Sequence, residues 1–282
     1  ELHRAYINQI LNRQLAREEG LPVALEAIGR AIELDPDDAI SLSRLGWVKM
    51  KFQADLRAAA QYHERALALE PGNAIVLANV AALLTALGRV QKSIIVHEWV
   101  VQRDPLNPIS VFNLSHAYFA GGRFDKAEAG LRKTLQLSPG YAGAPGQLAR
   151  VLYNKGDLDA ARQLIEKAPP SMVRVLGEAL MHHAVGNDEQ CDASLSTLID
   201  EYAPMSSGAV SLLYAVRGDF DAAFEWLQTA LDLRGPEVLI IFRDAPEIEA
   251  ARKDPRFEKM LAQHGLSEQQ LSAIRLEVKL PE

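Results

Sequence analysis

The sequence repeats itself about every 34 residues, and this period restricts the fold more than any other feature of the chain. Each period holds two stretches in which apolar residues recur every three to four positions, as in amphipathic helices. Prolines that follow an acidic residue or a serine lie 35, 34 and 34 residues apart, at Pro36, Pro71, Pro105 and Pro139. Glycines mark the middle of the periods, at Gly88, Gly122, Gly156, Gly186 and Gly218. Because proline ends a helix and glycine permits a tight turn, each period predicts a hairpin of two helices, A and B.

Small residues mark the places where the two helices of each hairpin would touch. In helix A these positions hold Asn12, Gly46, Ala81, Ser115, Ala149, Ala179 and Ser211. The partner positions in helix B hold Ala24, Ala59, Ser93, Ala127, Ala161, Cys191 and Ala223. Thirteen of the fourteen are Gly, Ala, Ser or Cys. This pattern predicts close approach of the two helix axes in every hairpin.

On these residues the chain resembles the tetratricopeptide repeat family, with about seven repeats over residues 5–236. The resemblance implies an all-α fold, a right-handed superhelical solenoid of about seven helical hairpins. Pro145, Pro169 and Pro170 depart from the repeat pattern and predict a kink or an altered stacking angle near residues 168–174. We predict a solenoid at residues 1–236 and a C-terminal helical cap at residues 237–282 that shields the last repeat.

The cap is expected to contain short helices. Residues 246–251 and 254–264 have helical patterns, and Gly265 suits the end of the second helix. Ser267 followed by Gln270 predicts a capping box that begins a last helix, which is expected to reach about Leu276. Trp226 and Phe257 are expected to hold the cap against the last repeat.

A closer resemblance rests on residues 218–227 (GDFDAAFEWL), on residues 254–257 (DPRF) with Gly265-Leu266, and on Ala5-Tyr6 with residues 31–36. These motifs are similar to the C-terminal repeat region of bacterial multidomain regulators, in which the repeats follow a class III adenylate cyclase or a winged-helix domain. The resemblance implies a regulatory role, sensing a ligand or a partner, within a larger protein. It implies no chemistry for this stretch, which is expected to be part of a longer chain.

The charge, the apolar stretches and the cysteine content of the chain disfavour several classes of function. The 282 residues include 30 basic and 37 acidic ones, and a net charge of -7 disfavours a dedicated nucleic-acid binder. No apolar stretch is long enough to cross a membrane. Cys191 is the single cysteine, so no disulfide can form within the chain. This favours a reducing compartment such as the cytoplasm, while a periplasmic location stays open if the parent protein is anchored in a membrane.

The sequence offers no catalytic, cofactor or metal motif, so we predict that the chain is not an enzyme. The glycine-rich residues 140–146 lack the lysine of a phosphate-binding loop. His63 and His97 occupy the same place in adjacent B helices, and either pack as core residues or share a metal or a proton. Cys191 is expected to be buried and inert.

Polar residues on the A helices predict a binding groove. One inward position reads Arg44, Asn79, Asn113 and Gln147 in successive repeats. The same helical spacing places around it Trp47, Lys51, Thr85, Phe112, His116, Phe119, Arg150 and Tyr153. Side-chain amides can pair with the backbone of an extended peptide, and the cations favour an acidic segment or a C-terminal carboxylate. In the alternative interpretation, the asparagines bond between A helices, and Trp47 and Phe119 pack against their neighbours.

The sequence therefore predicts a module that binds a protein or peptide partner in this groove. A first alternative is the sensory domain of a membrane-anchored regulator, which responds to a small molecule or an envelope protein. A second alternative is an arm that docks substrates for an attached enzyme. A homodimer through residues 238–242 or 271–278 is also possible, although packing of the cap explains both segments.

Overall fold

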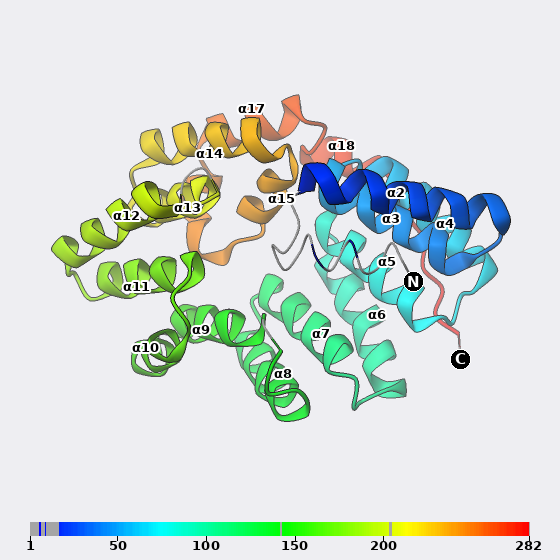
Figure 1. Ribbon diagram of the computed structural model, residues 1–282, viewed down its shortest axis with the longest axis horizontal. Helices are drawn as coiled ribbons and strands as arrows, with labels where there is room; N and C mark the ends of the chain where they lie inside the picture. Colours follow the sequence, from blue (N-terminus) through cyan, green and yellow to red (C-terminus); the bar gives the residue numbers. More distant parts are fainter. Residues whose placement is uncertain (1–5, 7–8, 10–16, 142, 203–204, 282) are drawn as a thin grey trace. The chain divides into compact units, whose positions relative to one another are not determined.

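The computed structural model describes residues 6, 9, 17–141, 143–202 and 205–281, and within these ranges the chain is helical, without a β-strand (Figure 1). The all-α prediction is confirmed. The repeat helices are α2 (Arg17–Leu34), α3 (Ala39–Gln53), α4 (Leu56–Leu69), α5 (Ala74–Ala86), α6 (Val90–Arg103), α7 (Pro108–Ala120), α8 (Phe124–Leu137), α9 (Ala144–Lys155), α10 (Leu158–Lys167), α11 (Met172–Ala184), α12 (Asp188–Tyr202), α13 (Ser207–Arg217) and α14 (Phe220–Arg234). None of the described helices is long and apolar enough to cross a membrane.

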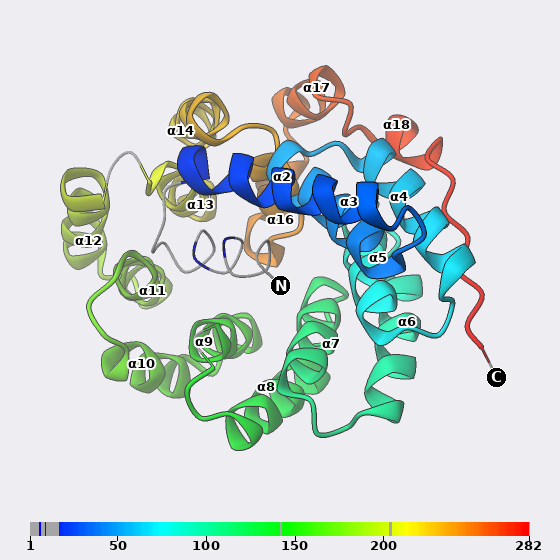
Figure 2. The ribbon, with the colours of Figure 1, turned by 45° about the vertical axis from the view of Figure 1, so that its right-hand side comes forward.

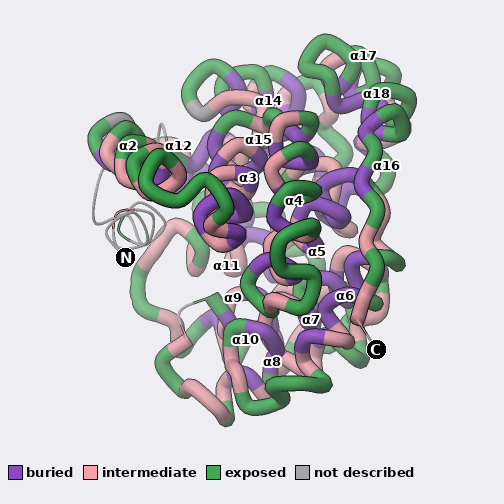
Figure 3. Tube along the Cα trace, turned by 90° about the vertical axis from the view of Figure 1, so that its right-hand side faces the viewer, coloured by how far each residue is buried: buried purple, intermediate pink, exposed green. Residues whose placement is uncertain are grey.

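The helices pair as the period predicts. From α3/α4 to α13/α14, each odd-numbered helix is helix A of a hairpin and the following one is helix B. Helix α2 is helix B of the first repeat; the predicted helix A before it, with Asn12, lies outside the described residues. Buried and exposed stretches alternate along the helices (Figure 3).

The chain forms two compact units. One comprises residues 1–83 together with 274–282, and the other comprises residues 84–273. Within the second unit, α7, α9, α11 and α13 lie on the inner side of an arc, and α8, α10, α12 and α14 lie on its outer side (Figure 2). This matches the expectation that A helices form the inner face. The predicted boundary between solenoid and cap at residue 236 remains a prediction.

Close packing inside a hairpin is clearest between α3 and α4. A Cβ added to Gly46 would lie 3.0 Å from Cε1 of His63 and 3.1 Å from the carbonyl oxygen of Ala59. In the last hairpin, the Ser211 hydroxyl donates to the carbonyl oxygen of Ala223 at 2.8 Å. Both contacts join residues that the sequence pattern pairs, so the predicted close approach of the helix axes is confirmed in these two hairpins.

The turn between helices A and B requires a residue whose backbone has the left-handed conformation, with positive φ. Gly88, Gly122 and Gly156 have φ of +75°, +69° and +80°, and Ala54 holds the corresponding place in an earlier repeat with φ of +51°. A side chain is disfavoured in this conformation because its Cβ crowds the following carbonyl oxygen.

Ala54→Gly is therefore expected to stabilise the chain by about 0.5–1 kcal/mol, since relief of the strain exceeds the entropy that glycine costs. Gly88→Ala is the converse control and should destabilise by about 1 kcal/mol, because a Cβ there meets no atom within 4 Å and only the backbone conformation is strained. Urea unfolding measures both changes. Destabilisation by Ala54→Gly would contradict this account of the turn.

The repeat pattern changes where the sequence departs from it. Helix α10 ends at Lys167, Ala168 is extended with ψ of 146°, and Ser171 caps the start of α11. The two prolines between them explain this geometry, because a residue before proline favours an extended backbone. With ten residues, α10 is the shortest of the B helices whose bounds the structure gives.

The segment after α14 folds as a chain of short elements. They are α15 (Glu237–Arg243), the 3-10 turn η1 (Pro246–Ile248), α16 (Glu249–Arg252), α17 (Pro255–Gln263) and α18 (Glu268–Ser272). The capping box of Ser267 and Gln270 is confirmed. The expectation that the last helix reaches Leu276 is wrong, because α18 ends at Ser272. Beyond it, apolar and charged residues alternate from Ile274 onward, a period of two that suits an extended segment.

An aromatic cluster holds the short elements against the last repeat. The Phe257 ring stacks on Phe224 of α14 at 6.5 Å and contacts Phe242 of α15 at 5.4 Å. Trp226 packs against the core formed by α11, α12 and α13, and its expected role in holding the cap stays a prediction. Phe224 and Trp226 are two residues apart on α14 and therefore point in different directions. Phe224 is the one that contacts Phe257.

Candidate functional site

The predicted groove residues of the first unit are engaged in internal contacts. Asn79 on α5 donates from Nδ2 to the Ser43 hydroxyl on α3 at 3.0 Å, which joins two neighbouring A helices. Trp47 meets the Phe52 ring edge-on at 5.8 Å. Arg44 and Lys51, also on α3, are half-buried and have partners of their own. Here the structure has the contacts of the alternative interpretation, with the amide bonded between helices.

The second unit brings several predicted residues together. On α7, Asn113 is half-buried, His116 is exposed and Phe119 is buried. The Arg150 guanidinium of α9 lies 5.0 Å from the centre of the Phe119 ring, within range of a cation–π interaction. Tyr153, on the same helix, is half-buried between two parts of the core.

Arg150 binds the carboxylate of Glu247, a residue of the same chain. Its Nε and Nη2 donate to the two oxygens of Glu247 in η1, each at 3.0 Å. Asn154 adds a third bond, from Nδ2 to Oε1 of Glu247 at 3.2 Å. A planar guanidinium that pairs with both carboxylate oxygens is the strongest geometry for such a pair. We call Arg150, Asn154 and Glu247 the carboxylate site.

The two charged side chains of the carboxylate site differ in their exposure to solvent. The Glu247 side chain is 1% exposed, whereas the Arg150 side chain is 35% exposed. Burial, followed by the charge of Glu247, raises the pKa of the Tyr153 phenol. Tyr153 therefore stays neutral at physiological pH and leaves the positive charge of the site to Arg150.

A further polar group lies on the same face of α9. Gln147 precedes Arg150 by three residues, and Asn154 follows it by four, so the three side chains share one helix face. Gln147 is buried, and its Nε2 has no hydrogen-bond partner among the residues that the structure describes. A buried amide donor without a hydrogen-bond partner is energetically costly.

Sequence reasoning found Arg150, Phe119, Gln147 and Tyr153 but missed Asn154 and Glu247. Asn154 could have been found, because it lies one helical turn beyond Arg150. Glu247 could not, since it follows Arg150 by 97 residues and the repeat pattern has ended before it.

The two equivalent histidines are core residues. His63 and His97 are buried, and one ring nitrogen of each lacks a partner in the described part of the chain. Burial lowers the pKa of His63 to about 4, and burial together with the charge of His116 lowers that of His97 to about 4. Within the described residues, no three His, Cys, Asp or Glu side chains gather to hold a metal ion. The expectation that Cys191 is buried is confirmed, and burial raises the pKa of its thiol.

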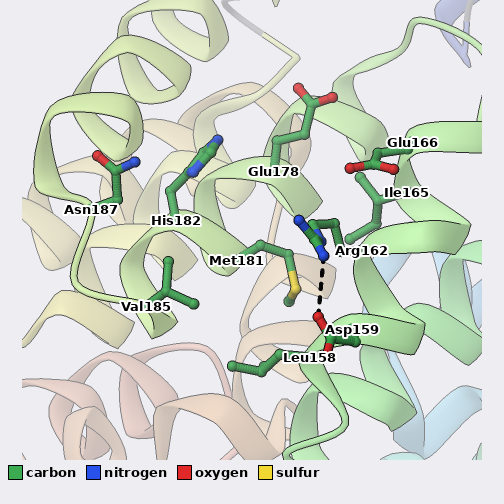
Figure 4. Close-up of a pocket in the computed structure, with 10 residues that line it drawn as sticks. All are labelled: Leu158, Asp159, Arg162, Ile165, Glu166, Glu178, Met181, His182, Val185 and Asn187. Atoms are coloured by element: carbon green, nitrogen blue, oxygen red, sulfur yellow. Dashed lines mark hydrogen bonds and ion pairs between the residues drawn. The ribbon is translucent and has the colours of Figure 1, made fainter.

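A pocket of about 470 Å³ lies between α10 and α11, where the repeat spacing changes (Figure 4). Its apolar wall includes Ile165 and Met181, and Asp159 pairs with Arg162 at 3.1 Å on its rim. The remaining lining residues are Leu158, Glu166, Glu178, His182, Val185 and Asn187. Charged residues of both signs at the rim of an apolar wall suit a small amphipathic molecule.

Comparison with known families points to one class of protein. Residues 131–180 match the family model described as tetratricopeptide repeat. Together with the hairpin fold and its similarity to solved repeat proteins, this match supports the tetratricopeptide repeat family. Repeats of this kind stack into solenoids with extended concave binding surfaces.

Several solved structures share this fold. A tetratricopeptide repeat protein from Parabacteroides merdae superposes with a TM-score of 0.58 at 18% identity, covering 93% of this chain and 99% of that one. PilW, a type IV pilus biogenesis factor, gives a TM-score of 0.57 at 19% identity over 74% of this chain and 97% of its own. PilF of Pseudomonas aeruginosa gives 0.52 at 21% identity over 78% and 97%. At these identities the likeness shows the fold alone.

One curated relative is more similar in sequence. The tetratricopeptide repeat and J domain-containing co-chaperone of Fusarium oxysporum f. sp. lycopersici is 35% identical over 123 residues, which are 40% of this chain and 24% of the relative. The chain thus spans about a quarter of the length of that protein.

Proposed function

We propose that the chain is a non-catalytic module that binds an extended segment of a protein partner along the inner faces of its A helices. The observation that carries this proposal is the carboxylate site, where Arg150 and Asn154 of helix α9 hold a carboxylate through three hydrogen bonds. A helix face that holds one acidic side chain in this way has the chemistry to recognise an acidic segment.

Two further features support a protein partner. Asn113 and Asn154 place half-buried amide groups on the neighbouring A helices α7 and α9, where a peptide backbone can pair with them. The repeats belong to a scaffold fold, and the relative in Fusarium combines such repeats with a J domain in a co-chaperone.

We also infer a regulatory role in a larger bacterial protein. The support is the similarity of residues 218–227 and 254–257 to the C-terminal repeats of bacterial regulators. In this proposal, partner binding alters the activity of an attached domain.

Affinity capture from native lysate tests the binding proposal. Asn113→Ala is expected to lose at least one protein that the wild-type chain retains, because it removes an amide from the inner helix α7. The matched control is Gln136→Ala, which removes an exposed amide from the outer helix α8. Circular dichroism and melting check that both variants are folded. Equal retention by the two variants, or no specific capture, would contradict the proposal.

A second function is favoured by the pocket between α10 and α11. If the chain is instead the sensory domain of a membrane-anchored regulator, this pocket is the place for a small-molecule input. One variant distinguishes the two functions. Val185 lines the pocket and is exposed, so Val185→Trp would obstruct the pocket without disturbing the core. It should abolish a small-molecule response and leave protein capture unchanged.

A further inference from the structure

We propose that Glu247 is an internal competitor: the η1 segment occupies the carboxylate site in place of a partner, and an acidic partner segment binds by displacing it. This inference rests on the proposed function, because it presumes that the α9 face receives a partner. It adds the chemistry of the partner, an acidic side chain in an extended segment, and the element of this chain that regulates access.

The first support is the quality of the contact. Arg150 pairs with both oxygens of Glu247 at 3.0 Å, and Asn154 bonds one of them at 3.2 Å. The guanidinium carbon of Arg150 lies over the Phe119 ring, 5.0 Å from its centre. The site is therefore complete, with donors for a carboxylate and an aromatic floor.

The second support is the nature of the element that fills the site. Between Arg243 and Lys253 the chain forms only a three-residue 3-10 turn and a four-residue helix. Elements this short are not stable by themselves and depend on tertiary contacts. Ile248 and Ala251 are buried and anchor the segment, and Arg252 donates to the carbonyl oxygen of Arg243 at 2.9 Å. We infer that opening this segment costs less than opening a repeat hairpin, which has two long helices.

The third support is a donor that Glu247 does not use. Gln147 lies on the same face of α9 as Arg150 and Asn154, and its amide nitrogen has no partner among the described residues. This nitrogen is buried, so a longer segment that brings both a carboxylate and a backbone carbonyl would satisfy it only after the residues that cover it have moved. Such a segment gains a hydrogen bond that the internal η1 turn does not make.

A peptide copied from the chain itself tests the inference. The probe is residues 242–251 (FRDAPEIEAA), acetylated and amidated at its ends so that only side-chain carboxylates are offered. The variant Glu247→Gln lacks the internal carboxylate. If the internal contact is closed in about nine of ten wild-type molecules, we expect the variant to bind the probe about ten-fold more tightly than wild type. Fluorescence anisotropy measures the dissociation constants.

Matched controls separate this effect from a general loss of charge. Glu249→Gln makes the same chemical change two residues away, at an exposed side chain that pairs with the exposed Lys253, and should bind the probe as wild type does. Adding Arg150→Gln to Glu247→Gln should abolish the gain. A probe that carries the Glu247→Gln change should not bind. Equal affinity of wild type and Glu247→Gln for the probe would overturn the inference.

A measurement on the wild-type chain covers the case in which Glu247→Gln fails to fold. Saturating probe should accelerate amide hydrogen exchange in residues 244–252, because the displaced segment becomes exposed to solvent. Unchanged exchange would overturn the inference. If the probe has no effect while capture still depends on Asn113, only the internal competition fails. If capture does not depend on Asn113, the proposed function itself fails.

Discussion

Lowering the pH from 7 to 5 is expected to reduce the free energy of unfolding by about 4 kcal/mol, through His63 and His97 together. Both side chains are buried, and burial lowers each pKa to about 4 in the folded chain, against about 6.5 when unfolded. The unfolded state therefore binds protons between pH 6.5 and pH 4 that the folded state does not bind. Stability is fully present above pH 6.5 and falls as the pH drops toward 4, by about 1.36 kcal/mol per pH unit for each histidine.

Urea unfolding at pH 7, 6 and 5 measures this effect. His63 lies in the unit of residues 1–83 and His97 in the unit of residues 84–273, so each contributes about 2 kcal/mol to its own unit at pH 5. His97→Leu should flatten the pH dependence of the second unit. The exposed His264→Gln is the control and should leave that dependence unchanged. A wild-type stability that is constant from pH 7 to 5 would contradict the account.

Phe257→Ala is expected to destabilise the second unit by about 3–5 kcal/mol, the usual cost of truncating a buried phenylalanine. Phe257 is 2% exposed and contacts both Phe224 of the last repeat and Phe242 of α15. Removal of its ring leaves a cavity at the place where the short C-terminal elements meet the repeats. Denaturant unfolding followed by tryptophan fluorescence, to which Trp99 and Trp226 of this unit contribute, measures the loss.

The control for this truncation is Ile241→Ala on α15. Ile241 is 52% exposed, so its truncation removes little buried surface and should cost less than about 1 kcal/mol. A loss below about 1 kcal/mol for Phe257→Ala would show that the ring does not hold these elements in place.

The repeat pattern predicted the hairpins because its signals are local. Proline and glycine fix the ends and turns of helices, and small residues such as Gly46 fix where two helices touch. The extended end of the chain after Ser272 was missed, because the capping box at Ser267 marks where a helix begins and not where it ends.

The candidate site was predictable only in part. Periodicity placed Arg150 and Phe119 on A helices, and the structure brings them together. It did not show that Asn79 bonds to Ser43, because amides bond equally well to a ligand or to a neighbouring helix. Nor did it show Glu247, which reaches α9 through tertiary folding of a segment outside the repeats.

The central claim is that the inner faces of the A helices bind the partner, and a hydrogen-exchange footprint of the complex tests it most directly. With the protein recovered by affinity capture, the account predicts slower amide exchange in α7 and α9 than in the free chain. It predicts no change in the outer helices α8 and α12. Protection confined to the outer helices, with α7 and α9 unchanged, would contradict the account and place recognition on the opposite face.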